Sequence, residues 1–268
     1  MNTKSIFLLS NDDGYKSLGI QYLRNYLLCH GTVILVAPRI NKSACSSSLT
    51  VNKQIKITKI SNREYIVNGT SADCVNIATR GLLSTQPDYV ISGINFGSNM
   101  GDDVVYSGTI GAAIEGRFCK KISVAISITN KKPRYLDDIE KKLNLFLPKL
   151  LKMKNSSDIL NVNIPDMPFS KIKGVKYTKL GKRLISKRAN IVVSDNLIFA
   201  DIGDVGNPKS YSAGTDFHAV NHVVFLEKKL LISQFDYLFF LSWLTSVSYT
   251  HLRAHETRED LVCRLLRE

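Results

Sequence analysis

The chain has 268 residues, of which 36 are Lys or Arg and 23 are Asp or Glu, so its formal net charge at pH 7 is +13. With 44% hydrophobic and 22% charged residues it has the composition of a globular protein, which excludes disorder as its main state. A chain of this length buries about three quarters of its unfolded surface, so it needs no disulfide or metal ion to stabilise a core.

The first predicted elements form a strand–helix–strand unit. Residues 5–10 are a short apolar run that predicts a buried strand ending in the polar sequence Asn-Asp-Asp-Gly. Residues 18–28 place apolar side chains at helical spacing, with Gly31 as the expected C-cap, and residues 32–37 predict a second buried strand that Pro38 closes. This order predicts a parallel, right-handed βαβ unit.

The later elements continue the alternation of strands and helices. Such alternation predicts a doubly wound, mostly parallel, Rossmann-like α/β sheet, in which ligands bind outside the carboxyl ends of the strands. The expected elements are a strand pair over residues 51–68, helices over 73–83, 110–118 and 136–152 (the last disturbed by Pro148), strands over 89–92 and 122–128, and a strand followed by a helix over 220–244.

Two segments depart from this pattern. Residues 170–215 contain short strand-like runs separated by turns, and we expect a β-rich, hairpin-like appendage that contacts another subunit. Residues 248–268 resemble a tail that arises when sequencing-adapter sequence is translated, so we exclude them, with their two histidines and one cysteine, from the functional argument. We expect residues 1–247 to form a single α/β domain.

Composition also bears on location and partners. No apolar run approaches the roughly 20 residues of a membrane span, and the N-terminal run at residues 6–9 is shorter than the roughly 7–15 residues of a signal-peptide core. Five cysteines without a Cys-x-x-Cys pair favour free thiols in a reducing compartment, so we expect a cytoplasmic protein. The scattered basic residues predict neither a membrane nor a specific nucleic-acid partner, but their positive field would attract a phosphorylated substrate.

Polar side chains follow several of the predicted strands. The first strand ends in the adjacent carboxylates Asp12 and Asp13, residues 38–47 are rich in Asn, Lys and Ser, Asn95 follows a later strand, and residues 107–109 begin a predicted helix. Adjacent carboxylates repel each other, and a divalent cation with oxygen ligands would relieve the repulsion. A helix N-terminus is a ready anion site. Together these features outline a site for phosphoester hydrolysis.

Taken together, these motifs resemble the SurE survival-protein nucleotidases. The resemblance extends from the N-terminus to about residue 244, with many motifs in the right order. They are residues 8–14, 37–38, 41–43, 46–50, 69–74, 87–88, 92–95, 101–103, 106–109, 115–117, 181–183 and 214–217.

The resemblance implies a SurE-like fold and a metal-dependent phosphatase that acts on nucleoside 5′- and 3′-monophosphates, with short polyphosphate as a further substrate of some members. It implies one divalent ion per subunit, Mg²⁺ or Mn²⁺, held by Asp12, Asp13, Ser43 and Asn95, and a homodimer or homotetramer. Family members usually have glycine directly after this serine, whereas this chain has Ala44 and also differs at the two residues that follow Pro38.

The expected roles in hydrolysis divide among a few residues. We expect Asn41 together with Ser107, Gly108 and Thr109 to bind the phosphate oxygens, and Asp12, Asn41 and Ser107 to act in catalysis, with Asp12 as the proton-transfer group.

Three alternatives stay open at this stage. The first is an aspartyl-phosphate enzyme with Asp12 or Asp13 as nucleophile, although familiar enzymes of that type space their carboxylates one residue apart. The second is a non-catalytic nucleotide-binding module, which would be expected to carry a Gly-x-Gly-x-x-Gly sequence after the first strand. The third is an inactive homologue, suggested by the altered 39–44 loop and the tail.

Overall fold

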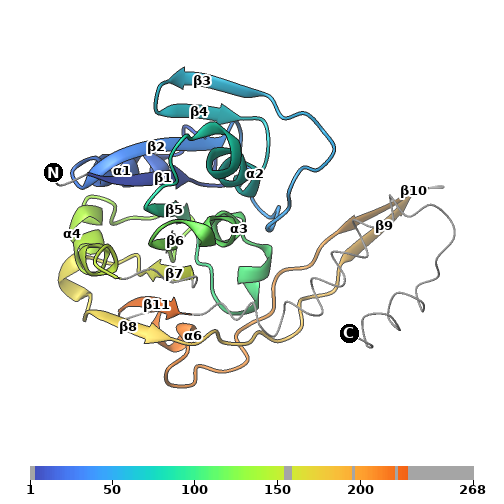
Figure 1. Ribbon diagram of the computed structural model, residues 1–268. Helices are drawn as coiled ribbons and strands as arrows, with labels where there is room; N and C mark the ends of the chain where they lie inside the picture. Colours follow the sequence, from blue (N-terminus) through green and yellow to red (C-terminus); the bar gives the residue numbers. More distant parts are fainter. Residues whose placement is uncertain (1–3, 154–158, 195–196, 221–222, 229–268) are drawn as a thin grey trace, which may run out of the picture. The chain divides into compact units, whose positions relative to one another are not determined.

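In the computed structural model, the described residues (4–153, 159–194, 197–220 and 223–228) form a main sheet of nine strands and a separate two-stranded hairpin (Figure 1). They belong to a unit that spans residues 1–230. The order in the main sheet is β3-β4-β2-β1-β5-β6-β7-β11-β8. The strands are β1 Ser5–Ser10, β2 Gly31–Pro38, β3 Ile57–Ser61, β4 Glu64–Val67, β5 Tyr89–Phe96, β6 Ile122–Ile128, β7 Ile159–Ile164, β8 Val175–Thr178 and β11 Val224–Lys228, with β9 Asn190–Ser194 and β10 Leu197–Asp201 in the hairpin.

The centre of the main sheet is parallel and is covered on both faces. Strands β4, β2, β1, β5, β6 and β7 run parallel, while β3 and β11 each pair antiparallel with their inner neighbour. The central strands β5, β6 and β7 are buried along almost their whole length, as expected when helices cover both faces. The helices are α1 Leu18–Leu28, α2 Ser71–Ile77, α3 Gly108–Glu115, α4 Ile139–Asn144, α5 Leu147–Leu150 and α6 Asp216–Ala219, with a 3₁₀ turn at Gly101–Tyr106.

Two hydrophobic clusters lie on the opposite faces of β1. Phe7 and Leu9 pack with buried side chains of α1, α4 and α5, whereas Leu8 packs with buried side chains of α2 and with Ala112 of α3. This follows from the two-residue period of a strand, which sends successive side chains to opposite faces. The doubly wound, mostly parallel sheet predicted from the sequence is therefore confirmed.

The prediction of one long helix over residues 136–152 is wrong. The segment forms two short helices, and α5 begins at Leu147 with Pro148 in its first turn. Proline has no N–H to donate to the carbonyl four residues earlier, so it interrupts a helix but fits the first turn of a new one. The predicted C-cap at Gly31 is also wrong. Gly31 lies in β2, where a Cβ atom would be 2.3 Å from the carbonyl oxygen of Ser5 on β1.

The predicted appendage over residues 170–215 is too long at its N-terminal end. Strand β8 belongs to the main sheet, where it pairs with β11, and only β9 and β10 form the separate hairpin. A bridge between Lys179 and Thr215 marks the point where the chain leaves the sheet and returns to it. We call residues 179–215 the arm.

Some expectations concern residues that the structure does not describe. Strand β11 matches the strand expected at the start of residues 220–244, but the helix expected after it and the tail at residues 248–268 lie outside the described residues. Among the residues that are described, no helix has both the length and the apolar character needed to cross a bilayer.

Candidate active site

The carboxyl ends of β1 and β5 lie side by side. The two strands are parallel neighbours, and Ser10 of β1 is in register with Ser92 of β5. Asp12 and Asp13 follow two and three residues after Ser10, and Asn95 follows three residues after Ser92. Strand β2, which follows β1 in the chain, lies on one side of β1, and the later strand β5 lies on its other side. Such a switch point is where open α/β sheets bind their ligands.

Asp12 is fixed against the N-terminus of α3. Its side chain is buried, with 4% exposure, and its Oδ1 accepts a hydrogen bond of 2.6 Å from the Thr109 hydroxyl. Gly108 allows this approach, because a Cβ atom on that residue would lie 2.8 Å from the Cβ of Asp12. The positive end of the helix stabilises a carboxylate at this position.

Thr109 holds the Asp12 carboxylate through two of its groups. Thr109 is fully buried, and both its hydroxyl and its backbone amide bind the Asp12 carboxylate. Its hydroxyl proton is therefore engaged by Asp12 in this structure. Ser107 caps α3, because its Oγ accepts a 3.2 Å hydrogen bond from the Ile110 amide. Phosphate binding by Ser107, Gly108 and Thr109 stays a prediction.

The 39–50 loop, which carries Asn41 and Ser43, is bonded to the Asp12 segment. The Lys42 amide donates to the carbonyl oxygen of Asp12 at 2.7 Å. Within the loop, Oδ1 of Asn41 accepts a 2.7 Å hydrogen bond from the Ser43 amide, and both side chains are exposed. Ser46 then donates through its Oγ to the carbonyl of Val105 at 2.6 Å. The loop thus connects the end of β1 to the segment before α3.

The far end of the 39–50 loop is held by a residue to which the sequence analysis gave no role. The carboxylate of Asp73 accepts hydrogen bonds from both the amide and the hydroxyl of Thr50, each at 2.7 Å. Asp73 also completes a capping box with Thr70 at the start of α2. The Thr-x-x-Asp spacing is a recognisable sign of a capping box, but nothing in it indicates that the same carboxylate anchors a distant loop.

Asn95 presents its carbonyl oxygen for binding. Its Nδ2 donates to the carbonyl of Gly97 at 2.7 Å, which fixes the orientation of the amide. Among the described residues, no hydrogen bond to its Oδ1 is found. Oδ1 of Asn95, the residue that the resemblance assigns to a metal ion, is therefore available as a ligand.

Electrostatics favours a cation beside Asp12 and Asp13. Burial raises the pKa of Asp12, an effect that hydrogen bonds from Thr109 partly offset. Burial, together with the charge of Asp12, raises the pKa of Asp13 to about 6. Within the described part of the chain, no group of three or more His, Cys, Asp or Glu side chains could hold a metal ion. Two carboxylates with hydroxyl and amide oxygens nevertheless suit a hard divalent cation that keeps several waters.

Replacement of Ala44 by glycine is predicted to stabilise the folded protein. Ala44 has a φ of 62°, a left-handed conformation that costs residues other than glycine about 1–2 kcal/mol. Ala44→Gly should raise the free energy of unfolding by about 0.5–1 kcal/mol, since the greater freedom of glycine in the unfolded chain offsets part of the relief. Thermal unfolding should show a Tm increase of about 1–4 °C. Ala72→Gly in α2 is the control and should lower Tm; a lower Tm for Ala44→Gly as well would contradict the argument.

Removal of the hydrogen bond from Thr109 to Asp12 is predicted to lower activity. Thr109→Val keeps the shape of the side chain but removes the hydroxyl that orients the Asp12 carboxylate. We expect kcat/KM for phosphate release to fall about 10- to 100-fold, because a hydrogen bond to a charged group contributes roughly 1.5–3 kcal/mol. Thr109→Ser retains the hydroxyl and should keep most of the activity. Equal rates for the two variants would show that the hydroxyl does not position Asp12.

Comparisons with known proteins place these residues in context. A protein family described as survival protein SurE matches residues 7–187 of this chain. Proteins named 5′-nucleotidase SurE from Actinobacillus succinogenes and Vesicomyosocius okutanii are 43% and 42% identical to it, over 80% and 81% of this chain and 87% and 88% of theirs. The crystal structure of the SurE protein from Aquifex aeolicus aligns with a TM-score of 0.73 and 36% identity, covering 88% of this chain and 99% of that chain.

Proposed function

The chain belongs to the survival protein SurE family, and on this premise we propose that it is a metal-dependent phosphatase that hydrolyses nucleoside 5′-monophosphates to a nucleoside and phosphate. One observation carries the proposal. The buried Asp12 carboxylate is held at the start of α3 by Thr109, and its backbone is bonded to the loop that carries Asn41 and Ser43. Residues predicted to bind metal and phosphate are thereby joined by hydrogen bonds in one region.

The donor set suits a divalent cation, Mg²⁺ or Mn²⁺, with one ion per subunit. Asp12, Asp13, Ser43 and Asn95 would hold it, and their net charge would nearly balance the charge of the ion. When bound, such a cation supplies positive charge for a phosphoryl oxygen and for the attacking water. The hydroxyl and the amide among these donors are neutral, so a phosphate dianion would not meet excess negative charge.

Other groups of the chain would bind the phosphate and move the proton. The Nδ2 group of Asn41 has no hydrogen-bond partner among the described residues, because only its Oδ1 is used, by Ser43. It can donate to a phosphate oxygen, together with Ser107 and the amide of Gly108 at the positive end of α3. Asp12 is also the proposed proton-transfer group. Its Oδ1 accepts the Thr109 hydroxyl, so its Oδ2 would face both the cation and the attacking water.

The same site supports a broader range of substrates. All of the proposed contacts are made to the phosphoryl group, and none depends on the position of the ester on the sugar. We therefore include nucleoside 3′-monophosphates and, as a side activity, the terminal phosphate of short polyphosphate in the proposal.

Phosphate release from a panel of 5′- and 3′-nucleotides and short polyphosphate, with and without a chelator, tests the function. The expected result is release that a chelator abolishes and that added Mg²⁺ or Mn²⁺ restores. Release that persists in chelator would contradict the metal-dependent site, and nucleotide binding without release would favour a binding module. A beryllium fluoride adduct on the carboxylate of Asp12 or Asp13, which mimics an acyl phosphate, would instead establish an aspartyl-phosphate enzyme.

The arm supports a proposal about assembly. Apolar side chains on it are exposed, including Ile185 at 93% and Ile202 at 95%, and β9 and β10 carry more of them. Large exposed apolar patches mark association sites. We propose that a second copy of the chain covers this surface in a homodimer or homotetramer, within a SurE-like domain that includes residues 1–247. The free cysteines of the described chain fit the proposed cytoplasmic location.

A further inference from the structure

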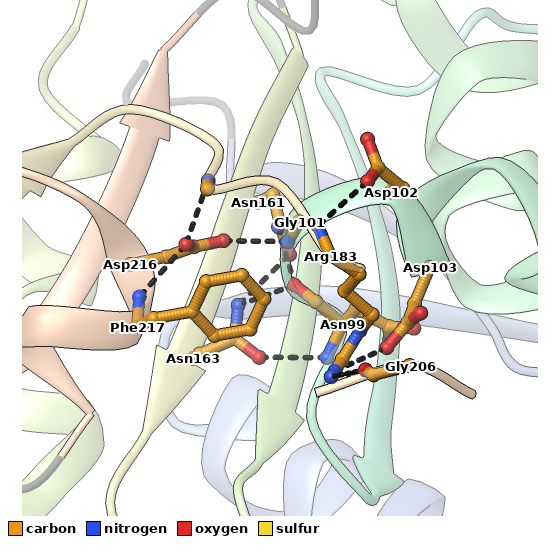
Figure 2. A network of polar contacts seen from close by, with 11 residues as sticks. Asn99, Gly101, Asp102, Asp103, Asn161, Asn163, Arg183, Gly206, Asp216 and Phe217 are labelled. Atoms are coloured by element: carbon orange, nitrogen blue, oxygen red, sulfur yellow. Dashed lines mark hydrogen bonds and ion pairs between the residues drawn. The ribbon is translucent and has the colours of Figure 1, made fainter. Parts of the chain in front are cut away.

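A network of polar contacts, buried at Asp216 and exposed at Asp102, joins the base of the arm to the segment before α3 (Figure 2). At its centre is Asp216, which is 1% exposed. Its Oδ2 accepts a hydrogen bond from the Gly101 amide at 2.7 Å, and its Oδ1 accepts from the amides of Gly181 and Phe217, each at 2.8 Å. A single carboxylate therefore connects the 3₁₀ turn at Gly101–Tyr106 with the outgoing and returning ends of the arm.

Arg183 makes a second connection between the arm and the same turn. Its backbone amide donates to Oδ2 of Asp102 at 2.9 Å, and its guanidinium pairs with Oδ2 of Asp103 at 2.5 Å. The guanidinium also donates to the carbonyl of Gly206 at 3.0 Å and lies 4.9 Å from the centre of the Phe217 ring. One side chain thus contacts both ends of the arm and the turn.

The sheet fixes the chain just before this turn. The Asn99 amide donates to Oδ1 of Asn163 at 2.9 Å, and its Nδ2 donates to the Ser127 hydroxyl at 2.7 Å. The carbonyl of Asn99 accepts from the side chains of Asn161 and Asn163, each at 2.9 Å (Figure 2). Asn99 is therefore anchored to β6 and β7, whereas the turn that follows is anchored to the arm.

The Gly101–Tyr106 turn contacts two parts of the candidate active site. Ser107, the N-cap of α3, follows directly after it, and the Ser107 amide donates to the carbonyl of Val104 at 3.3 Å. The carbonyls of Val105 and Tyr106 accept hydrogen bonds from Ser46, at 2.6 and 3.2 Å. A displacement of the turn would therefore move both the start of α3 and the 39–50 loop.

We propose that Asp216 and Arg183 are positioning residues that fix the Gly101–Tyr106 turn, and through it the groups that bind the phosphoryl oxygens, so that the base of the arm sets the affinity of the site for phosphate. The inference rests on the proposed function, because it concerns the same phosphate groups. Neither residue touches the substrate in this account. Their effect is geometric, and small displacements of positioned groups have large effects on binding and rate.

Asp216→Asn tests the proposal. Three backbone N–H groups point at this side chain, and an amide has only one oxygen, so its NH₂ must face at least one donor. With the oxygen toward Gly181 and Phe217, the bond to Gly101 is lost. The Ki of inorganic phosphate as a product inhibitor and the KM for nucleotides should rise together, about tenfold and equally for every base. Amide hydrogen exchange across residues 101–107, measured well below Tm without substrate or metal, should become faster.

Asp204→Asn is the matched control, since Asp204 is an exposed carboxylate of the arm that pairs only with Lys187 among the described residues. It should leave Ki and exchange unchanged. If Asp216→Asn does not fold, Asp103→Asn tests the proposal in its place. It should raise the Ki of phosphate about threefold by weakening the ion pair with Arg183. An unchanged Ki in a folded variant, with the wild type active, would overturn the positioning role. An inactive wild type would contradict the proposed function instead, while the exchange measurement would still report on the turn.

Discussion

Asp12→Asn is expected to abolish metal-dependent phosphate release, with a loss of about a thousandfold or more in kcat. The substitution preserves the shape of the side chain and an oxygen that can accept the Thr109 hydroxyl, so the start of α3 should stay in place. It removes one of the two charges that would hold the cation, whose stabilisation of the transition state amounts to several kcal/mol. Measurement of phosphate release at saturating Mn²⁺ and nucleotide checks the loss.

A carboxylate at the opposite edge of the sheet provides the control. Asp88 lies just before β5, where its Oδ2 accepts a 2.7 Å hydrogen bond from the Ile6 amide. Asp88→Asn makes the same chemical change far from the carboxyl ends of β1 and β5, and it should leave activity within about twofold, as is usual for a change that disturbs no essential group. Comparable activity in Asp12→Asn and the wild type would remove Asp12 from the site.

Asp13→Asn should stabilise the folded protein when no metal ion is bound. Burial and the charge of Asp12 raise the pKa of Asp13 to about 6 in the folded protein, compared with 3.8 as its ordinary value. Ionisation of Asp13 therefore lowers the free energy of unfolding. This loss is absent below pH 4 and complete above pH 6. Allowing for the partial exposure of this side chain to solvent, the cost is about 1–2 kcal/mol. The metal-free variant should thus be more stable than the wild type at pH 7.5.

Divalent cations should reverse this order. A ligand present at 100 times its Kd stabilises the folded state by about 2.7 kcal/mol, and the wild type should gain this with Mn²⁺ while the variant gains little. Unfolding measured at pH 4 and pH 7.5, in chelator and in Mn²⁺, checks the prediction, and the two metal-free proteins should be nearly equal at pH 4. A variant that is less stable than the wild type in chelator at pH 7.5 would show that the two carboxylates do not strain the metal-free site.

Local patterns account for much of the fold and for part of the candidate site. The apolar run of β1 and the helical spacing of α1 were sufficient to place Asp12 and Asp13 at the carboxyl end of a central strand. The motif before α3 likewise predicted a helix start, and Ser107 is its N-cap. These features depend on side-chain periodicity and capping within a few residues, so they are present in the sequence itself.

The roles of individual side chains were harder to predict. Thr109 stands in a motif that suggests phosphate binding, yet its hydroxyl donates to Asp12, 97 residues away in the chain. Asp216 bonds to Gly101, 115 residues away, and nothing near Asp216 in the sequence indicates this partner. Strand β8 resembles the strands of the arm, but it pairs with β11 at the edge of the main sheet. A short strand has no local signal for the sheet that it joins.

The sequence by itself determined the alternation of strands and helices from β1 to β6, the edge of the sheet where the acidic pair lies, and the resemblance that indicated a nucleotidase. It did not indicate strand β7. Only the tertiary structure decided that Thr109 serves Asp12, that Asp73 anchors the 39–50 loop, and that the base of the arm holds the turn before α3. The physical reason is the range of the interactions. Propensity, periodicity and caps act between near neighbours in the chain, whereas a buried carboxylate takes its hydrogen bonds from whichever distant backbone groups the packing of the sheet brings beside it.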